Sequence, residues 1–169
     1  MQNKIIIAIY VDNQYGVLSR VTAMFTRRGY NIDSLTVGET ESPEYSRITI
    51  TLTAEKNDKD QVVSQLHKLY NVKKVIVLST EDCIKRELLL IKVRNTEQAH
   101  ADIVEATNIF RTKIIDFTDE AISIEATGDS QKIDAFIDYM KKFDIIEMCR
   151  TGIVALDRGS TNIWSEHED

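Results

Sequence analysis

The sequence of 169 residues is poor in the residue types that build disulfide frameworks and metal centres. Its two cysteines, Cys83 and Cys149, are too few for a disulfide framework and indicate a reducing, cytoplasmic environment. Its three histidines, His67, His100 and His167, are each far in sequence from a cysteine and from one another, so no metal cluster is expected. These absences argue against zinc-dependent and disulfide-stabilised classes of protein.

Motifs of common enzymes are also missing. The chain has no Walker loop, no nucleophile elbow and no dinucleotide-binding fingerprint. Residues 1–5 show no signal-peptide pattern, and no apolar run is long enough to span a bilayer. A net charge of −6 argues against nucleic acid as the main partner, because such binding needs a basic surface. We therefore expect a soluble cytoplasmic protein that is not itself an enzyme.

The first half of the chain alternates strands with helices. The first expected strand is apolar at successive positions, so both of its faces are expected to be covered. Apolar residues at helical spacing follow from Gly16 to Arg28, and Gly29 provides a stop. The expected elements are strands over residues 4–11, 31–39, 48–53 and 72–78, a helix over residues 16–28 and a helix capped by Asn57 or Asp58. Their order is β-α-β-β-α-β, the ferredoxin-like arrangement.

The second half repeats this order with different residues. It predicts strands over residues 88–93, 113–118, 121–127 and 145–156, a helix over residues 96–110 and a helix capped by Asp129 or Ser130. The expected fold class is therefore α+β, with two ferredoxin-like βαββαβ modules in tandem. We assign residues 1–80 to the first module and residues 81–158 to the second. The polar, acidic tail over residues 159–169 is expected to be mobile.

The most informative segment joins the first strand to the first helix. The helix opens at Gly16, and such a turn leaves backbone N–H groups without partners at the helix N-terminus, where the helix dipole favours an anion. Neither lysine nor arginine lies between Asp12 and Ser19. An anion held here would be small and bound mainly by amides, with Asn13 as the one versatile side chain. The carboxylate of a free amino acid fits this description better than a polyphosphate does.

A glycine at such a turn can also serve the backbone geometry alone, so the turn by itself leaves both interpretations open. Asn31 and Ile32, at the start of the second strand, favour a ligand site. Side-by-side pairing of two such domains would bring these residues of one subunit opposite the Gly16 turn of the other. Strand carbonyls would then accept hydrogen bonds from an α-ammonium while helix amides bind the carboxylate. Val17, Leu18 and Ile32 would leave room for a small aliphatic side chain.

Several longer strings in the chain are specific to one family. In the first half they are GVLSRV from Gly16, FTRRGYNIDSLTV over residues 25–37, Ser46-Arg47 and QLHKL over residues 65–69. In the second half they are REL from Arg86, IFR from Ile109, IID from Ile114, KIDAF from Lys132 and RTGIV from Arg150. Together they resemble the small, regulatory subunits of acetolactate synthase (acetohydroxyacid synthase), and residues 1–80 look like an ACT domain. The resemblance covers essentially all of the chain except the tail.

The resemblance implies a non-catalytic subunit that pairs with a large catalytic subunit. The large subunit would carry thiamine diphosphate, Mg²⁺ and FAD and would condense two pyruvates, or pyruvate with 2-oxobutyrate. This chain would bind none of these cofactors. It would raise the activity and make it sensitive to feedback by valine, and in some members by leucine or isoleucine. Matched residue by residue in a homodimer, the effector site falls on Asn13, Gly16, Val17 and Leu18 of one subunit and Asn31 and Ile32 of its neighbour.

Tyr15 departs from this resemblance, because the family usually has a small residue here and ACT domains broadly often have proline. Its ring is expected to narrow or cover the pocket. Two other classes of protein remain open. One is a free-standing amino-acid sensor that regulates another enzyme. The other is a transcription factor that pairs a sensor fold with DNA-binding helices, which the acidic charge and the lack of a basic recognition helix disfavour.

Overall fold

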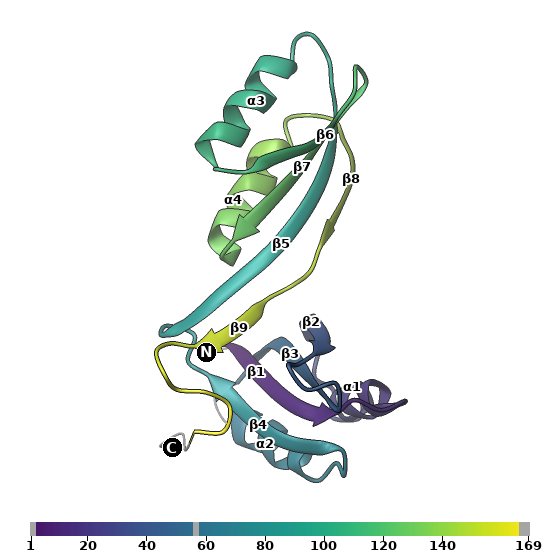
Figure 1. The fold of residues 1–169 in the computed structure, drawn as a ribbon, viewed down its shortest axis with the longest axis vertical. Coiled ribbons are helices and arrows are strands. Elements are labelled where there is room, and N and C mark those ends of the chain that lie inside the picture. The colour runs from purple at the N-terminus through teal and green to yellow at the C-terminus, as the bar shows by residue number, and fades with distance from the viewer. Residues whose placement is uncertain (1–2, 56–57, 166–169) are drawn as a thin grey trace. The chain divides into compact units, whose positions relative to one another are not determined.

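The computed structural model describes residues 3–55 and 58–165 (Figure 1). The chain forms two compact units. The first contains the residues up to Ile84 together with those from Ile153 onward, and the second contains Lys85–Gly152. Each unit has its own antiparallel sheet and its own hydrophobic core.

The first unit has the ferredoxin-like topology that the sequence predicts. Its sheet has the strand order β2-β3-β1-β4, and every neighbouring pair is antiparallel. The elements are β1 (Asn3–Asp12), α1 (Val17–Arg27), β2 (Ile32–Glu39), β3 (Tyr45–Ala54), α2 (Asp58–His67) and β4 (Val72–Leu78). Of the two residues expected to cap the second helix, Asn57 lies outside the described residues and Asp58 is the first residue of α2.

Helix α1 ends in a hydrogen-bonded motif that the sequence signals through Gly29. This glycine has a φ of 73°, a left-handed backbone conformation that residues other than glycine rarely adopt. The Tyr30 amide donates to the Phe25 carbonyl at 3.0 Å, and the Gly29 amide donates to the Thr26 carbonyl at 3.1 Å. This pair of bonds is the Schellman motif, which satisfies carbonyls at the helix end and turns the chain into β2.

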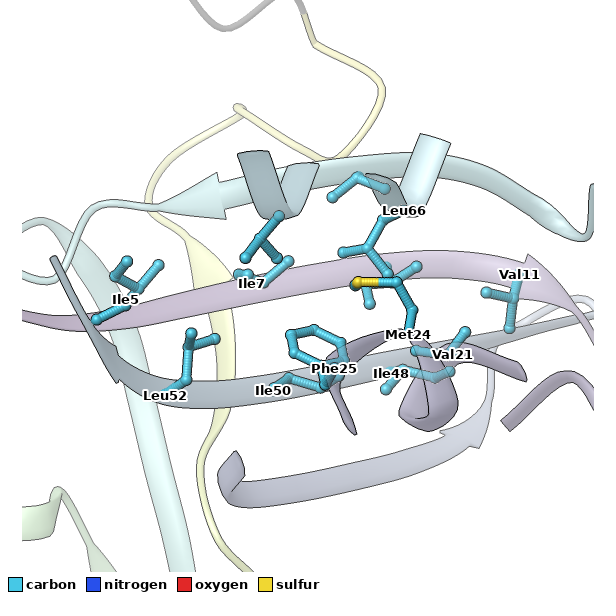
Figure 2. Close-up of a cluster of buried hydrophobic side chains, with 14 of the residues drawn as sticks. Ile5, Ile7, Val11, Val21, Met24, Phe25, Ile48, Ile50, Leu52 and Leu66 are labelled. Carbon is cyan, nitrogen blue, oxygen red and sulfur yellow. The ribbon is translucent and has the colours of Figure 1, made fainter. Parts of the chain in front are cut away.

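One face of β1 forms the main core of the first unit. Figure 2 shows Ile5, Ile7 and Val11 of β1 among buried side chains from β3 and from both helices. The side chains of Phe25 and Leu66 are fully buried, one from α1 and one from α2. Both helices therefore anchor to the same face of the sheet through their apolar stripes.

The opposite face of β1 is buried by the C-terminal segment of the chain. Ile6, Ala8 and Tyr10 share a cluster with Ile153, Ala155 and Ile163. Hydrogen bonds also hold this segment. The Thr36 hydroxyl donates to the Ile153 carbonyl at 3.1 Å, the Ile153 amide donates to the Ser34 hydroxyl at 3.5 Å, and the Arg47 guanidinium donates to the Ala155 carbonyl at 2.9 Å. Both faces of β1 are covered, as its uninterrupted apolar pattern predicts.

The tail over residues 159–169, which the sequence analysis expects to be mobile, contacts the first unit through Ile163 and Trp164. Ile163 is only 6% exposed. The Trp164 ring meets the Tyr10 ring edge-on, with 4.8 Å between the ring centroids. Ile163 and Trp164 therefore pack on the sheet, whereas residues 159–162 are exposed, because an isolated apolar pair in a polar tail is enough to fill a site on an apolar face. Residues 166–169 lie outside the described residues.

The second unit repeats the topology, with the strand order β6-β7-β5-β8. Helices α3 and α4 lie on one face of this sheet (Figure 1), around a core that contains the fully buried Phe136. The Asp129 carboxylate caps α4 by accepting from the Lys132 amide at 2.9 Å, as predicted. The elements are β5 (Cys83–Arg94), α3 (His100–Ile109), β6 (Lys113–Phe117), β7 (Ala121–Gly128), α4 (Ser130–Met140) and β8 (Ile145–Arg150).

The single strand expected over residues 145–156 is instead two strands, β8 and β9 (Val154–Asp157). The break lies at Gly152, whose φ of 84° interrupts the extended backbone. The residues from Ile153 onward belong to the first unit. The second unit thus ends at Gly152 and not at residue 158 as expected. The reason is that apolar residues after the break, among them Ile153 and Ala155, pack into a core of the first unit.

The packing of the tail predicts a stability difference between two substitutions of similar size. Ile163→Ala removes a buried side chain and is expected to lower the free energy of unfolding by about 2 kcal/mol or more. Leu156→Ala, in the same segment but 57% exposed, is the matched control and is expected to cost less than about 0.5 kcal/mol. Urea unfolding followed through the fluorescence of Trp164, the single tryptophan, measures both. Equal, small effects would contradict the packing of the tail.

Candidate functional site

The turn between β1 and α1 leaves backbone amides without a partner inside the helix. The first helical hydrogen bond runs from the Arg20 amide to the Gly16 carbonyl at 3.2 Å, and the Val17 amide donates to the Gln14 carbonyl at 3.4 Å. The amides of Leu18 and Ser19 therefore have no carbonyl four residues before them in the helix. Together with the helix dipole, these groups make the N-terminus of α1 suited to a small anion.

Gly16 is required at this turn by its backbone conformation. It caps α1 with a φ of 81° and makes no side-chain bond. A Cβ placed on Gly16 would meet no heavy atom within 4 Å, so the space in front of the helix is open. The glycine therefore sets the geometry that exposes the amides, and the same open space can receive a ligand.

The Asn13 side chain is already bonded within its own chain. Its Nδ2 donates to Glu39 Oε1 at 3.0 Å and to the Pro43 carbonyl at 2.9 Å, and its backbone amide donates to the Glu44 carbonyl at 2.7 Å. Since Nδ2 carries two hydrogens, both are used. Asn13 is thus fixed against the β2–β3 hairpin, and the group it has left for a ligand is the Oδ1 acceptor.

The other predicted residues of the turn differ in exposure. The Val17 side chain is buried in the core under the sheet, so only its backbone can meet a ligand. Leu18 is 37% exposed and is the apolar side chain of α1 that a ligand's aliphatic group can contact. Tyr15 is fully exposed, so its ring buries no surface against its own unit and does not cover the turn within one chain.

Asn31 and Ile32 lie at the other end of the sheet from this turn. Ile32 pairs with Leu52, whereas Asp12, just before the turn, pairs with Tyr45. Leu52 and Tyr45 are separated by seven positions along β3, or about 23 Å at the usual strand rise. One chain therefore does not bring the two groups of predicted residues together, and a site built from both requires two copies of the chain.

The entry into β2 is fixed by Tyr30. Its hydroxyl donates to Asp58 Oδ1 at 3.3 Å, which links the chain before Asn31 to the start of α2. Burial raises the pKa of the Tyr30 phenol, and the neighbouring Asp58 carboxylate raises it further. The phenol is therefore neutral at neutral pH and remains a hydrogen-bond donor to Asp58. This bond holds Tyr30 in place and thereby fixes the backbone position of the adjacent Asn31.

The structure also adds a residue that sequence patterns did not single out. Asn71 lies between α2 and β4, is only 4% exposed, and contacts both Asp12 and Gln14 through its side-chain amide. A lone asparagine in a short connection resembles any turn residue in the sequence, and only the folded chain brings it under the β1–α1 turn.

The described part of the chain shows neither a metal site nor a helix that could span a membrane. Within residues 3–55 and 58–165, no three His, Cys, Asp or Glu side chains gather as metal ligands would. No helix in the same part of the chain is long and apolar enough to cross a membrane. The chemistry that the turn offers is hydrogen bonding to a small polar molecule.

Comparison with known proteins gives a consistent assignment. A family model of the small subunit of acetolactate synthase matches residues 86–159, and a model of the AHAS small subunit-like ACT domain matches residues 7–74. The acetolactate synthase small subunit of Mycobacterium leprae is 43% identical over 157 residues, 93% of each chain. A probable acetolactate synthase small subunit of Archaeoglobus fulgidus is 47% identical over 154 residues, 91% of this chain and 96% of that one.

The crystal structure of the acetolactate synthase small subunit from Thermotoga maritima superposes with a TM-score of 0.88 at 38% identity. The match covers 94% of this chain and 99% of that one. The fold class is thus a tandem α+β protein whose first part is an ACT domain. The chain belongs to the family of acetolactate synthase small subunits, which confirms the resemblance seen in its sequence strings.

Proposed function

We propose that this chain is the non-catalytic, regulatory subunit of an acetolactate synthase in branched-chain amino acid biosynthesis. It raises the activity of the large catalytic subunit and makes that activity sensitive to inhibition by valine. Membership of the small-subunit family, together with the open amide-lined turn at Gly16, is the observation that carries this proposal. Thiamine diphosphate, Mg²⁺ and FAD would be bound by the large subunit, and this chain would bind none of them.

The chemistry of the turn suits a free amino acid. The amides at the start of α1 would bind its carboxylate, and Asn13 Oδ1 and the strand carbonyls near Asn31 would accept from its ammonium. The exposed Leu18 side chain and Ile32 would contact a small aliphatic side chain. Valine fits these contacts, and leucine or isoleucine would use the same groups.

A homodimer would complete the site. β2 is an edge strand of the sheet, so its outer edge has unpaired backbone groups that favour addition of a second strand. Val37 on this strand is half exposed. Pairing of two chains through this edge would place Asn31 and Ile32 of one chain opposite the Gly16 turn of the other, and a stable dimer would bury about 1,600 Å² in total.

Reconstitution tests the proposal as a whole. The purified chain alone is expected to condense no pyruvate, and its addition to the large catalytic subunit from the same source is expected to raise the rate of acetolactate formation. The same mixture should become sensitive to valine, whereas the large subunit alone should not. If the chain neither binds nor activates the large subunit, it is instead a free-standing amino-acid sensor that regulates another enzyme.

Gly16→Asp is expected to abolish valine inhibition and to leave activation largely intact. The new carboxylate would lie beside the ligand's own carboxylate, and at 4 Å with an effective dielectric of 20 their repulsion is about 4 kcal/mol before screening. Burial of an isopropyl group contributes only about 1.5–3 kcal/mol, so the repulsion should dominate. Valine titration of the reconstituted enzyme measures the effect.

Two controls separate charge from backbone strain in this experiment. Gly16→Asn adds a neutral side chain of the same shape at the same left-handed position and is expected to retain part of the inhibition. Gly159→Asp adds the charge at another left-handed glycine with open space around it and should retain all of it. An unchanged inhibition curve for Gly16→Asp would remove the effector site from this turn.

A shared site also predicts complementation between two defective chains. Gly16→Asp disables the turn, and Asn31→Lys places an ammonium where the strand should receive the ligand's ammonium. Each variant alone is expected to bind no valine, but a mixed dimer has one site with both changes and one with neither. An equal mixture should therefore recover roughly a quarter of the wild-type valine sites, counted by equilibrium dialysis of labelled valine. No recovery in a mixture proven to exchange subunits would contradict the two-chain site.

A further inference from the structure

Beneath the β1–α1 turn lies Asn71, a buried residue that makes several hydrogen bonds. Its Oδ1 accepts from Arg20 Nη1 at 2.7 Å. Its Nδ2 lies 3.2 Å from Asp12 Oδ2 and 3.4 Å from Gln14 Oε1, as a donor to both. Its backbone carbonyl accepts from the Asp12 amide at 2.9 Å.

These contacts join the three parts of the turn. Asp12 is the last residue of β1, Gln14 lies in the turn itself, and Arg20 lies in the first turns of α1. Asn71 reaches all three from the connection between α2 and β4, 51 residues after Arg20. The side-chain amide of Asn71 therefore fixes the end of the strand relative to the start of the helix. The backbone amides near Gly16 that have no partner inside the helix lie between these two points.

The charges around Asn71 favour a neutral amide at this position. Arg20 needs an acceptor, and Asp12 needs donors, which it receives from Asn71 and from Lys73 Nζ at 3.1 Å. Hydrogen bonds that involve a charged group are stronger than those between neutral groups. An asparagine meets both demands, whereas an aspartate would meet only that of Arg20 and would turn an oxygen toward Asp12 and Gln14.

We infer that Asn71 is a positioning residue of the effector site, which holds the β1–α1 turn in the conformation that binds the amino acid's carboxylate. This inference rests on the proposed function. Asn71 itself does not contact the ligand, because it is buried below the turn. It sets the direction of the Leu18 and Ser19 amides through Asp12 and Arg20, and loss of its bonds would free the turn without removing any ligand contact.

Asn71→Asp tests the inference in the reconstituted enzyme. The replacement has the same shape and keeps the acceptor for Arg20, but it exchanges the donor for a charged oxygen facing Asp12. The valine concentration for half-inhibition is expected to rise about tenfold, which corresponds to 1.4 kcal/mol of binding free energy. Activation of the large subunit is expected to stay within about twofold of wild type, a separation that a general loss of folding would not produce. Asn108→Asp, an exposed position on α3, is the matched control and should change neither.

Arg20→Met serves as a second variant if Asn71→Asp fails to fold. The Arg20 side chain is exposed, so this variant should fold, and it removes the bond to Asn71 Oδ1. The valine concentration for half-inhibition is expected to rise here too. Unchanged inhibition in a folded Asn71→Asp chain would overturn the positioning role and leave the proposed function standing. Loss of inhibition and activation together would also overturn it, in favour of a purely structural role. A wild-type enzyme insensitive to valine, leucine and isoleucine would instead overturn the proposed effector site, and this inference with it.

Discussion

The burial of β1 on both faces is the constraint on which the rest of the first unit depends. Successive side chains of a strand point to opposite faces, so a strand that is apolar at every position needs two covers. Helices α1 and α2 supply one, with Phe25 and Leu66 at its centre. The other comes from the far end of the chain, through Ile153, Ala155 and Ile163. The C-terminal segment therefore belongs to the first unit for an energetic reason: without it the apolar side chains of Ile6 and Tyr10 would face water.

The position of the candidate site follows from the same strand. β1 is held along its length by β3 and β4, so Asp12 at its end is a fixed point. Asn13 is then held on one side by the β2–β3 hairpin, and Asn71 holds Asp12 and α1 on the other. Between these attachments Tyr15 and Leu18, on either side of Gly16, are large apolar side chains that remain exposed. A rigid frame around a short open segment is the arrangement that a binding site for a small molecule needs, because little order is lost when the ligand arrives.

The sequence predicted most of the fold because the fold depends on local patterns. Alternation in β3, helical spacing in α1 and the stop at Gly29 each act within a few residues, and each was confirmed. The break at Gly152 and the packing of Ile163 were missed, since both depend on a face of β1 some 150 residues away in the chain. The site divides in the same way. Gly16 and its neighbours form a local motif that can be read from the sequence. Asn71 instead makes contacts with residues far away in the sequence, and no repeating pattern of residues indicates such contacts.

Under the proposed function, a site without a cation suits a feedback signal. Amides and carbonyls hold both ends of a zwitterion without an ion pair, so the binding energy comes from partial charges and from burial of one small aliphatic group. Such a site would respond when the amino acid accumulates and would empty when the amino acid is consumed. If two chains supply its two halves, each bound molecule also stabilises the dimer by mass action, because the ligand binds only the paired state. Ile32 and Asp12, the residue that leads into the turn, pair with β3 positions about 23 Å apart in one chain, and this separation is the feature that would couple valine level to subunit pairing.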